Sequence, residues 1–170
     1  MHVALSRTCM SVALVLGSGA ALADGATDIF EKINSCTEAA TQQQAGLIVG
    51  WKIDSAKEPV TMTVEVVAPD DRVWTMKCTE GKITGNPERK TGTKNYKMLS
   101  ARTKVPEVSA RFTAATAYPI SEMQKMEYGL SWKGKAYYTY DMKLNDGRDA
   151  TVDVNADTGQ VDRSKSERKG

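Results

Sequence analysis

Residues 133–161 read KGKAYYTYDMKLNDGRDATVDVNADTGQV, and this stretch decides the predicted fold. Apolar and polar side chains alternate over residues 136–144 and again over residues 150–156. A repeat of two residues indicates β-strands that bury one face. Residues 145–147 and 157–159 each end in glycine, which predicts tight turns between the strands. The stretch therefore predicts a three-stranded antiparallel sheet whose apolar face needs a covering layer.

A helix to cover this face is predicted directly after Pro106, since proline suits the first turn of a helix. Val108, Phe112 and Ala115 recur on one side of this helix, and we expect that side to face the sheet. The helix is expected to end before a short turn at 121–123. A strand over residues 127–132 then leads into the stretch quoted above.

The first half of the chain has the same predicted order of elements. Ile33, Cys36 and Ala40 recur at helical spacing, which predicts a helix near the start of this half. Strands are expected after it at 47–53, 60–67 and 73–78, with a short one at 82–83. The shared order predicts an α+β fold of two tandem modules. Each module would pack one helix on a small antiparallel sheet of three to four strands.

The chain begins with the pattern of a secretory signal peptide. Arg7 precedes an apolar run at 10–16, and Ala-Leu-Ala at 21–23 matches a cleavage site. We expect cleavage near Ala23 and a periplasmic or secreted protein; a buried N-terminal helix is the alternative. No later apolar run approaches the ~20 residues that span a bilayer, so no membrane span is expected.

Composition sets the remaining boundaries. With residues 1–23 as the signal peptide, we predict a first module at 24–85, a basic linker at 86–104, a second module at 105–163 and a flexible tail at 164–170. The linker contains six basic residues and one acidic residue, so a patch for an anionic partner is the alternative interpretation. The net charge of +2 is small, and we expect no nucleic-acid partner.

Cys36 and Cys78 are the cysteines that remain after the signal peptide. In an oxidising compartment such a pair is expected to form a disulfide, here between the first helix and a strand beneath it. A reactive thiol pair is the alternative. His2 is the single histidine and lies in the signal peptide, so the mature chain lacks the histidine of Ser-His-Asp, Cys-His and common zinc sites. We therefore expect no catalytic residues, no cofactor and no enzyme activity.

Four segments of the second module share a further pattern. They are an alanine-rich helix at 109–115, a tyrosine-containing strand at 136–140, an Asp-Gly turn at 146–148 and the ending NADTGQV at 155–161. In these segments the module resembles a PepSY domain. The resemblance implies a secreted or envelope binding module, similar to peptidase propeptides that inhibit their enzymes, without shared catalytic residues. It also implies that metal binding occurs in some relatives. The first module departs from the pattern, because Asp71 replaces the turn glycine.

Two sets of polar residues are candidate binding sites. Tyr137, Asp141 and Asp153 share the outward face of the predicted sheet and form a candidate ligand surface. Oxygen ligands suit hard cations, so a second candidate is a metal site, although its spacing does not match a calcium loop. Its residues would be Asp146, Asp149, Asp153 and Asp157.

The sequence thus predicts a periplasmic or secreted, non-enzymatic binding or regulatory module that recognises an envelope protein or peptide. Inhibition of a peptidase is one form that this activity would take. Addition of a peptide strand to an exposed sheet edge is the expected mode of recognition. The alternative function is a periplasmic protein that binds a metal ion or a small ligand.

Overall fold

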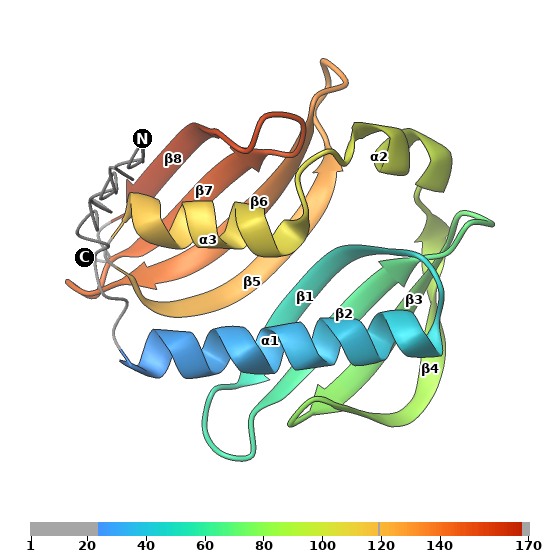
Figure 1. The fold of residues 1–170 in the computed structure, drawn as a ribbon, viewed down its shortest axis with the longest axis horizontal. Coiled ribbons are helices and arrows are strands. Elements are labelled where there is room, and N and C mark those ends of the chain that lie inside the picture. Colours follow the sequence, from blue (N-terminus) through green and yellow to red (C-terminus); the bar gives the residue numbers. More distant parts are fainter. Residues whose placement is uncertain (1–23, 119, 168–170) are drawn as a thin grey trace, which may run out of the picture.

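The computed structural model describes residues 24–118 and 120–167, so the predicted signal peptide lies outside the described residues. Helices and strands follow one another in two similar series (Figure 1). The first series is α1 (Asp24–Gln43), β1 (Leu47–Ser55), β2 (Thr61–Val67), β3 (Arg72–Thr79) and β4 (Lys82–Thr93). After α2 (Tyr96–Arg102), the second series is α3 (Glu107–Ala117), β5 (Ile120–Leu130), β6 (Ala136–Leu144), β7 (Asp149–Asn155) and β8 (Val161–Glu167).

All these strands form one antiparallel sheet of eight strands, in the order β4-β3-β2-β1-β5-β6-β7-β8. The prediction of two small sheets is therefore corrected to a single larger sheet. The joint between the two series is short, because residues 50–52 of β1 pair with residues 125–127 of β5 and the ladder extends no further. This pairing removes two strand edges that separate sheets would leave exposed.

Both long helices lie on the same face of the sheet, as Figure 1 shows. α1 contacts β1 to β4 and also β5, whereas α3 contacts β6, β7 and β8. Neither α1 nor α3 covers the opposite face, which we call the open face. No helix among residues 24–118 and 120–167 has the length and apolar character needed to cross a membrane.

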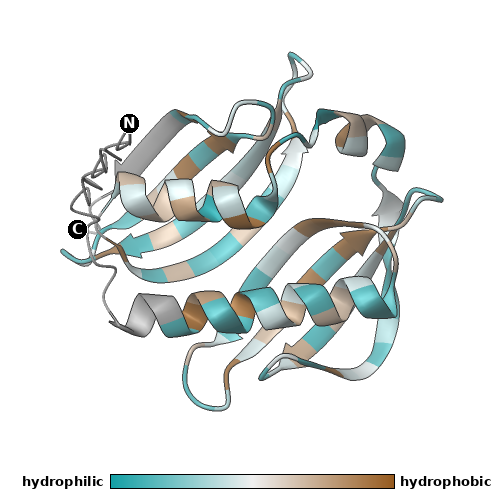
Figure 2. Ribbon diagram, in the orientation of Figure 1, coloured by the Kyte–Doolittle hydropathy of each residue, from teal (hydrophilic) through white to brown (hydrophobic). Residues whose placement is uncertain are grey.

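The predicted alternation along the second series is confirmed. Tyr138 and Tyr140 of β6 are fully buried on the helix side, while Tyr137 and Thr139, which alternate with them, are half-buried on the open face. β7 follows the same rule, with Val152 and its apolar neighbours buried. Figure 2 shows this alternation of apolar and polar residues along the strands.

Three boundaries differ from the predicted ones. Residues 121–123 belong to β5 rather than to a turn. The predicted basic linker at 86–104 contains the second half of β4 and the whole of α2. β8 runs as far as residue 167, so the predicted tail begins inside a strand that pairs with β7.

The buried side of α3 also differs from the predicted one. Val108 and Phe112 are about half-exposed, at 49% and 56%, whereas Arg111 is 1% exposed. Small alanines, among them Ala110 and Ala114, face the sheet and let the helix pack closely on it. Arg111 occupies the space towards α1, where its guanidinium group contacts polar and aromatic partners that a helical pattern alone does not reveal.

The predicted disulfide between Cys36 and Cys78 is confirmed. It joins α1 to β3 with a Cα–Cα separation of 5.8 Å, which lies within the range that disulfides require. Both cysteines are buried in the core, at 2% and 1% exposure. The bond therefore fixes the first helix onto the sheet, as the sequence predicted.

Candidate functional site

The second series of strands presents an ordered array of side chains on the open face. Gly129 of β5 lies opposite Tyr137 of β6 in the ladder. The next pair on this face joins Glu127 of β5 to Thr139 of β6. Thr139 in turn pairs with Asp153 of β7, so the three residues form a row across three strands. Directly paired residues share a face of the sheet, so these side chains border one area of the open face.

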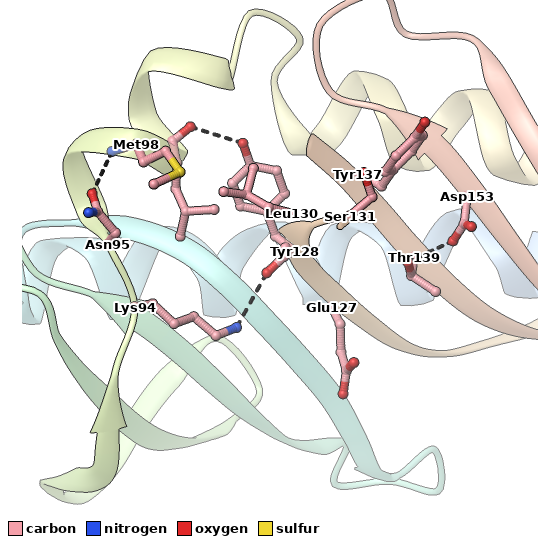
Figure 3. A pocket seen from close by; sticks show the side chains of 12 residues that line it. Lys94, Asn95, Met98, Glu127, Tyr128, Leu130, Ser131, Tyr137, Thr139 and Asp153 are labelled. Carbon is pink, nitrogen blue, oxygen red and sulfur yellow. Dashed lines mark hydrogen bonds between the residues drawn. The ribbon is translucent and has the colours of Figure 1, made fainter. Parts of the chain in front are cut away.

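A pocket of about 500 Å³ lies over this array, and we call it the Gly129 pocket. Gly129 leaves it open, since no atom outside its chain neighbours lies within 4 Å of the position that a Cβ would take. The pocket is shown in Figure 3. Its lining comprises Lys94, Asn95, Met98, Leu99, Glu127, Tyr128, Gly129, Leu130, Ser131, Tyr137, Thr139 and Asp153.

α2 forms one wall of the Gly129 pocket, and hydrogen bonds fix its position. The side chain of Asn95 caps the helix by accepting a bond of 2.8 Å from the Met98 amide. The buried Tyr128 hydroxyl donates to the Leu99 carbonyl at 3.0 Å. This wall is apolar, and Met98 in it is 47% exposed. Methionine adapts its shape easily, so the wall suits a variable apolar group.

Lys94 closes the gap where the central ladder ends. Its ammonium group donates to the carbonyl oxygens of Tyr128 at 3.3 Å and Val49 at 3.5 Å. Each of these residues lies next to the Gly50–Glu127 pair that ends the central ladder. Burial lowers the pKa of the Lys94 amine, against the opposing effect of nearby Glu65 and Glu127. Lys94 thus bridges the two halves of the sheet on the open face.

Two further pockets adjoin the Gly129 pocket. The Lys52 pocket, of about 650 Å³, lies over β1, β2 and the end of β4, and shares Lys94 and Glu127 with the Gly129 pocket. The Trp132 pocket, of about 270 Å³, lies at the β5–β6 turn and shares Ser131 and Tyr137 with it. We call the three together the open-face groove. It crosses the joint between the two halves of the sheet.

Acidic and basic side chains pair along much of this groove. Lys90 bonds Glu65 at 2.6 Å, and Lys125 lies 2.5 Å from Glu127. The hydrogen bond from Lys125 is the main cause that lowers the pKa of the Glu127 carboxyl. Lys125 thus favours the ionised form of Glu127 on the floor of the groove.

The predicted ligand surface falls partly within the groove. Tyr137 and Asp153 line the Gly129 pocket, and Asp153 accepts a hydrogen bond from Thr139 at 2.7 Å. Asp141 lies outside the lining and accepts a bond from Thr151 at 2.8 Å. The structure therefore brings two of these three residues to one pocket.

The four predicted metal candidates lie apart. Asp146 bonds Arg148 within its turn, Asp157 pairs with Lys104 at 2.6 Å, and Asp149 opens β7. In the part of the chain that the structure describes, no group of three or more acidic, cysteine or histidine residues is placed to hold a metal ion.

Gly129 and the α2 wall were not among the predicted site residues. The position of Gly129 inside a strand was an available signal, because glycine in a strand often marks an open or closely approached site. Met98 and Lys94 gave no comparable signal, since only the tertiary fold brings them to the end of β5.

Comparisons with known proteins identify no family. No family model matches the chain, and no curated protein matches it. Among solved structures, a "putative lipoprotein" from Clostridium difficile 630 aligns at 13% identity over 84% of this chain and 90% of that chain, with a TM-score of 0.47. The C-terminal domain of YpeB from Bacillus megaterium aligns at 13% identity over 82% of this chain, which spans 65% of that one, with a TM-score of 0.31. Both scores are below 0.5, so neither likeness carries an argument about function, and the PepSY resemblance stays a prediction.

Proposed function

We propose that this protein is a secreted or periplasmic binding module that recognises an extended peptide segment of an envelope protein and has no enzyme activity. The observation that supports this function best is the continuity of the open-face groove. The central Gly129 pocket shares two lining residues with each of the other two pockets, which suits a chain laid across the sheet more than a compact ligand. The Gly129 pocket alone also has a volume typical of small-molecule sites.

The β4 edge of the sheet is poorly suited to the addition of a peptide strand, which favours binding in the groove instead. Pro87 lies within β4 and cannot donate a ladder hydrogen bond. Gly85 and Gly92 in the same strand have positive φ angles of 76° and 104°, which disrupt a regular edge. Such features block pairing with a further strand. We therefore assign peptide recognition to the side chains of the groove.

The compartment and the arrangement of the chain support the same proposal. The Cys36–Cys78 disulfide fits an oxidising environment such as the periplasm or the cell exterior. Each half of the chain has one helix followed by four strands, and the two halves meet at β1 and β5. We infer two diverged PepSY-like modules fused through a common sheet. A peptidase is the partner that the PepSY resemblance suggests.

Substitution of Gly129 by leucine tests the groove. The new side chain is expected to fill the Gly129 pocket without backbone strain, because Gly129 lacks a positive φ angle and has open space above it. Peptides selected from a phage-displayed random library on the unaltered protein should bind this variant about tenfold more weakly or worse, since a filled pocket excludes the buried contact. Fluorescence anisotropy with labelled peptides measures the loss.

Thr151→Leu is the matched control for this variant. Thr151 is exposed on the open face of β7 but lines none of the three pockets. The Thr151→Leu variant should bind the selected peptides with the same affinity as the unaltered protein. Failure of the library to yield any enriched peptide, or equal affinity of the Gly129→Leu variant, would count against the proposed function.

A further inference from the structure

A rigid turn presents Trp132 at one end of the groove. Within residues 131–135, the Ser131 amide donates to the Lys135 carbonyl and the Gly134 amide to the Ser131 carbonyl, both at 2.8 Å. The Lys135 amide also donates to the Ser131 hydroxyl at 3.2 Å. Gly134 has a φ of 72°, which this tight turn requires. The turn is therefore fixed, and so is the position from which the indole projects.

The Trp132 side chain contributes little to the fold. It is 88% exposed, whereas Trp51 is 2% exposed and Trp74 is half-buried. The ammonium group of Lys133 lies 4.7 Å from the centre of its ring. Tryptophan is the residue type that most often dominates the energy of a protein interface. An indole held in water by a rigid turn thus has the properties of an interface anchor.

Two lysines without acidic partners lie beside this indole. Lys133 and Lys135 in the turn both line the Trp132 pocket, and neither forms an ion pair with another described residue. By contrast, Asp162 in the Trp132 pocket accepts hydrogen bonds from Tyr137 and Asn155. We call residues 131–135, which include these two lysines, the basic lip.

We propose that the basic lip selects an acidic peptide segment that carries an aromatic or large apolar side chain. This inference rests on the proposed function and names the chemistry of its partner. The apolar side chain packs against Trp132 and Tyr137, which line one pocket. Carboxylates on either side of it pair with Lys133 and Lys135. Charge complementarity of this kind sets partner choice and the rate of association.

An anionic membrane surface is the competing partner for a tryptophan flanked by lysines. The peptide is favoured because Trp132 lines a pocket that continues into the groove through Ser131 and Tyr137. A flat lipid surface cannot enter such a groove. One inserted side chain also gives only weak attachment to a bilayer, since stable attachment needs a larger apolar area or a second anchor.

Synthetic peptides with glutamates on both sides of one phenylalanine test the inference, alongside matched peptides with lysines or serines in place of the glutamates. The unaltered protein should bind the acidic peptide most tightly, and its tryptophan emission should shift to shorter wavelength. Trp132→Ala should abolish that shift and weaken binding about 30-fold, as for an interface hot spot. Lys133→Glu with Lys135→Glu should reverse the preference towards the basic peptide. Binding should also weaken as salt is added, because exposed charges are screened.

Lys143→Glu is the charge control, since Lys143 is exposed on β6, the strand after the turn, but lines none of the three pockets. It should leave the preference unchanged. If library selection yields peptides but these are basic or neutral, the inference is overturned and the proposed function stands. If vesicles of phosphatidylglycerol bind in place of the acidic peptide, the lip is a membrane site and the inference is also overturned. If no peptide of any charge binds, the proposed function falls with it.

Discussion

Replacing Arg111 with alanine is expected to lower the free energy of unfolding by roughly 3–5 kcal/mol, because it breaks a buried ion pair from one side. The Arg111 guanidinium bonds the Asn34 side chain on α1 and lies 3.5 Å from the Glu107 carboxylate. Glu107 in turn accepts hydrogen bonds from Trp51 and Tyr140. Loss of the cation would leave this carboxylate without its compensating charge. Denaturant unfolding followed by circular dichroism measures the change.

The destabilisation of this variant should depend on pH. Burial raises the pKa of the Glu107 carboxyl in the folded protein, and the Arg111 charge opposes that shift. Without Arg111 the pKa rises further above the unfolded value of 4.5. A raised carboxyl pKa means that the folded state binds the proton more tightly, so stability is lost as pH rises through that pKa. The cost of Arg111→Ala should therefore be smaller near pH 5 than near pH 8.

Phe112→Ala is the matched control, because the two residues are neighbours on α3 and both become alanine. Phe112 is 56% exposed, so its removal should change the free energy of unfolding much less than the loss of Arg111. A larger loss from Phe112 would refute this arrangement of α3. The double variant Arg111→Met with Glu107→Gln should recover part of the stability, because it removes both buried charges and keeps an acceptor for Trp51.

Arg111 also marks the limit of prediction from this sequence. A helical pattern places apolar residues towards the sheet, and by that rule Phe112 belongs inside and Arg111 outside. The rule fails here because Asn34 of α1 supplies a distant polar partner, and because Glu107, one turn away on α3, is itself bonded by Trp51 and Tyr140. A buried arginine depends on such tertiary contacts, and local periodicity contains no information about them.

Some strands could be predicted from local alternation, and others could not. Alternation from Ala136 to Leu144 was sufficient to predict β6 and its buried face, since each residue reports its own side of the sheet. The strand at 121–123 was missed, because bulges near Ile120 and Met123 interrupt the alternation in β5. The central joint was missed as well. Three residue pairs between β1 and β5 give no pattern within either strand.

Only part of the groove could be predicted from the sequence, because it depends on both strand parity and tertiary contacts. The outward positions of Tyr137 and Asp153 could be predicted from strand parity. Their common pocket could not, since it needs α2 as a wall and Lys94 as a bridge across the joint. Asp141 has the same parity and still lies outside the pocket, so parity defines a face but not a site on it.

Removal of the disulfide is the second change with a large expected effect. Cys36 and Cys78 are 42 residues apart, and a loop of this size corresponds to about 4 kcal/mol of stabilisation in the chain-entropy model. The double variant Cys36→Ala with Cys78→Ala should lose up to about this amount, as measured by denaturant unfolding. Because both sulfurs are buried, a mild reductant should reach the bond in the unaltered protein only after local opening.

The loss of stability in this double variant should be greater in the first half of the chain than in the second. Such a difference distinguishes a local effect of the disulfide from a general destabilisation. α1 is bonded to β3 through Cys36, whereas α3 in the second half carries no cysteine. Hydrogen exchange should therefore accelerate in α1 and β3 of the double variant more than in α3 and β7. Equal acceleration in both helices would contradict a disulfide that acts on the first half alone. It would mean that the short joint at β1 and β5, together with Arg111, couples the two halves into one unfolding unit.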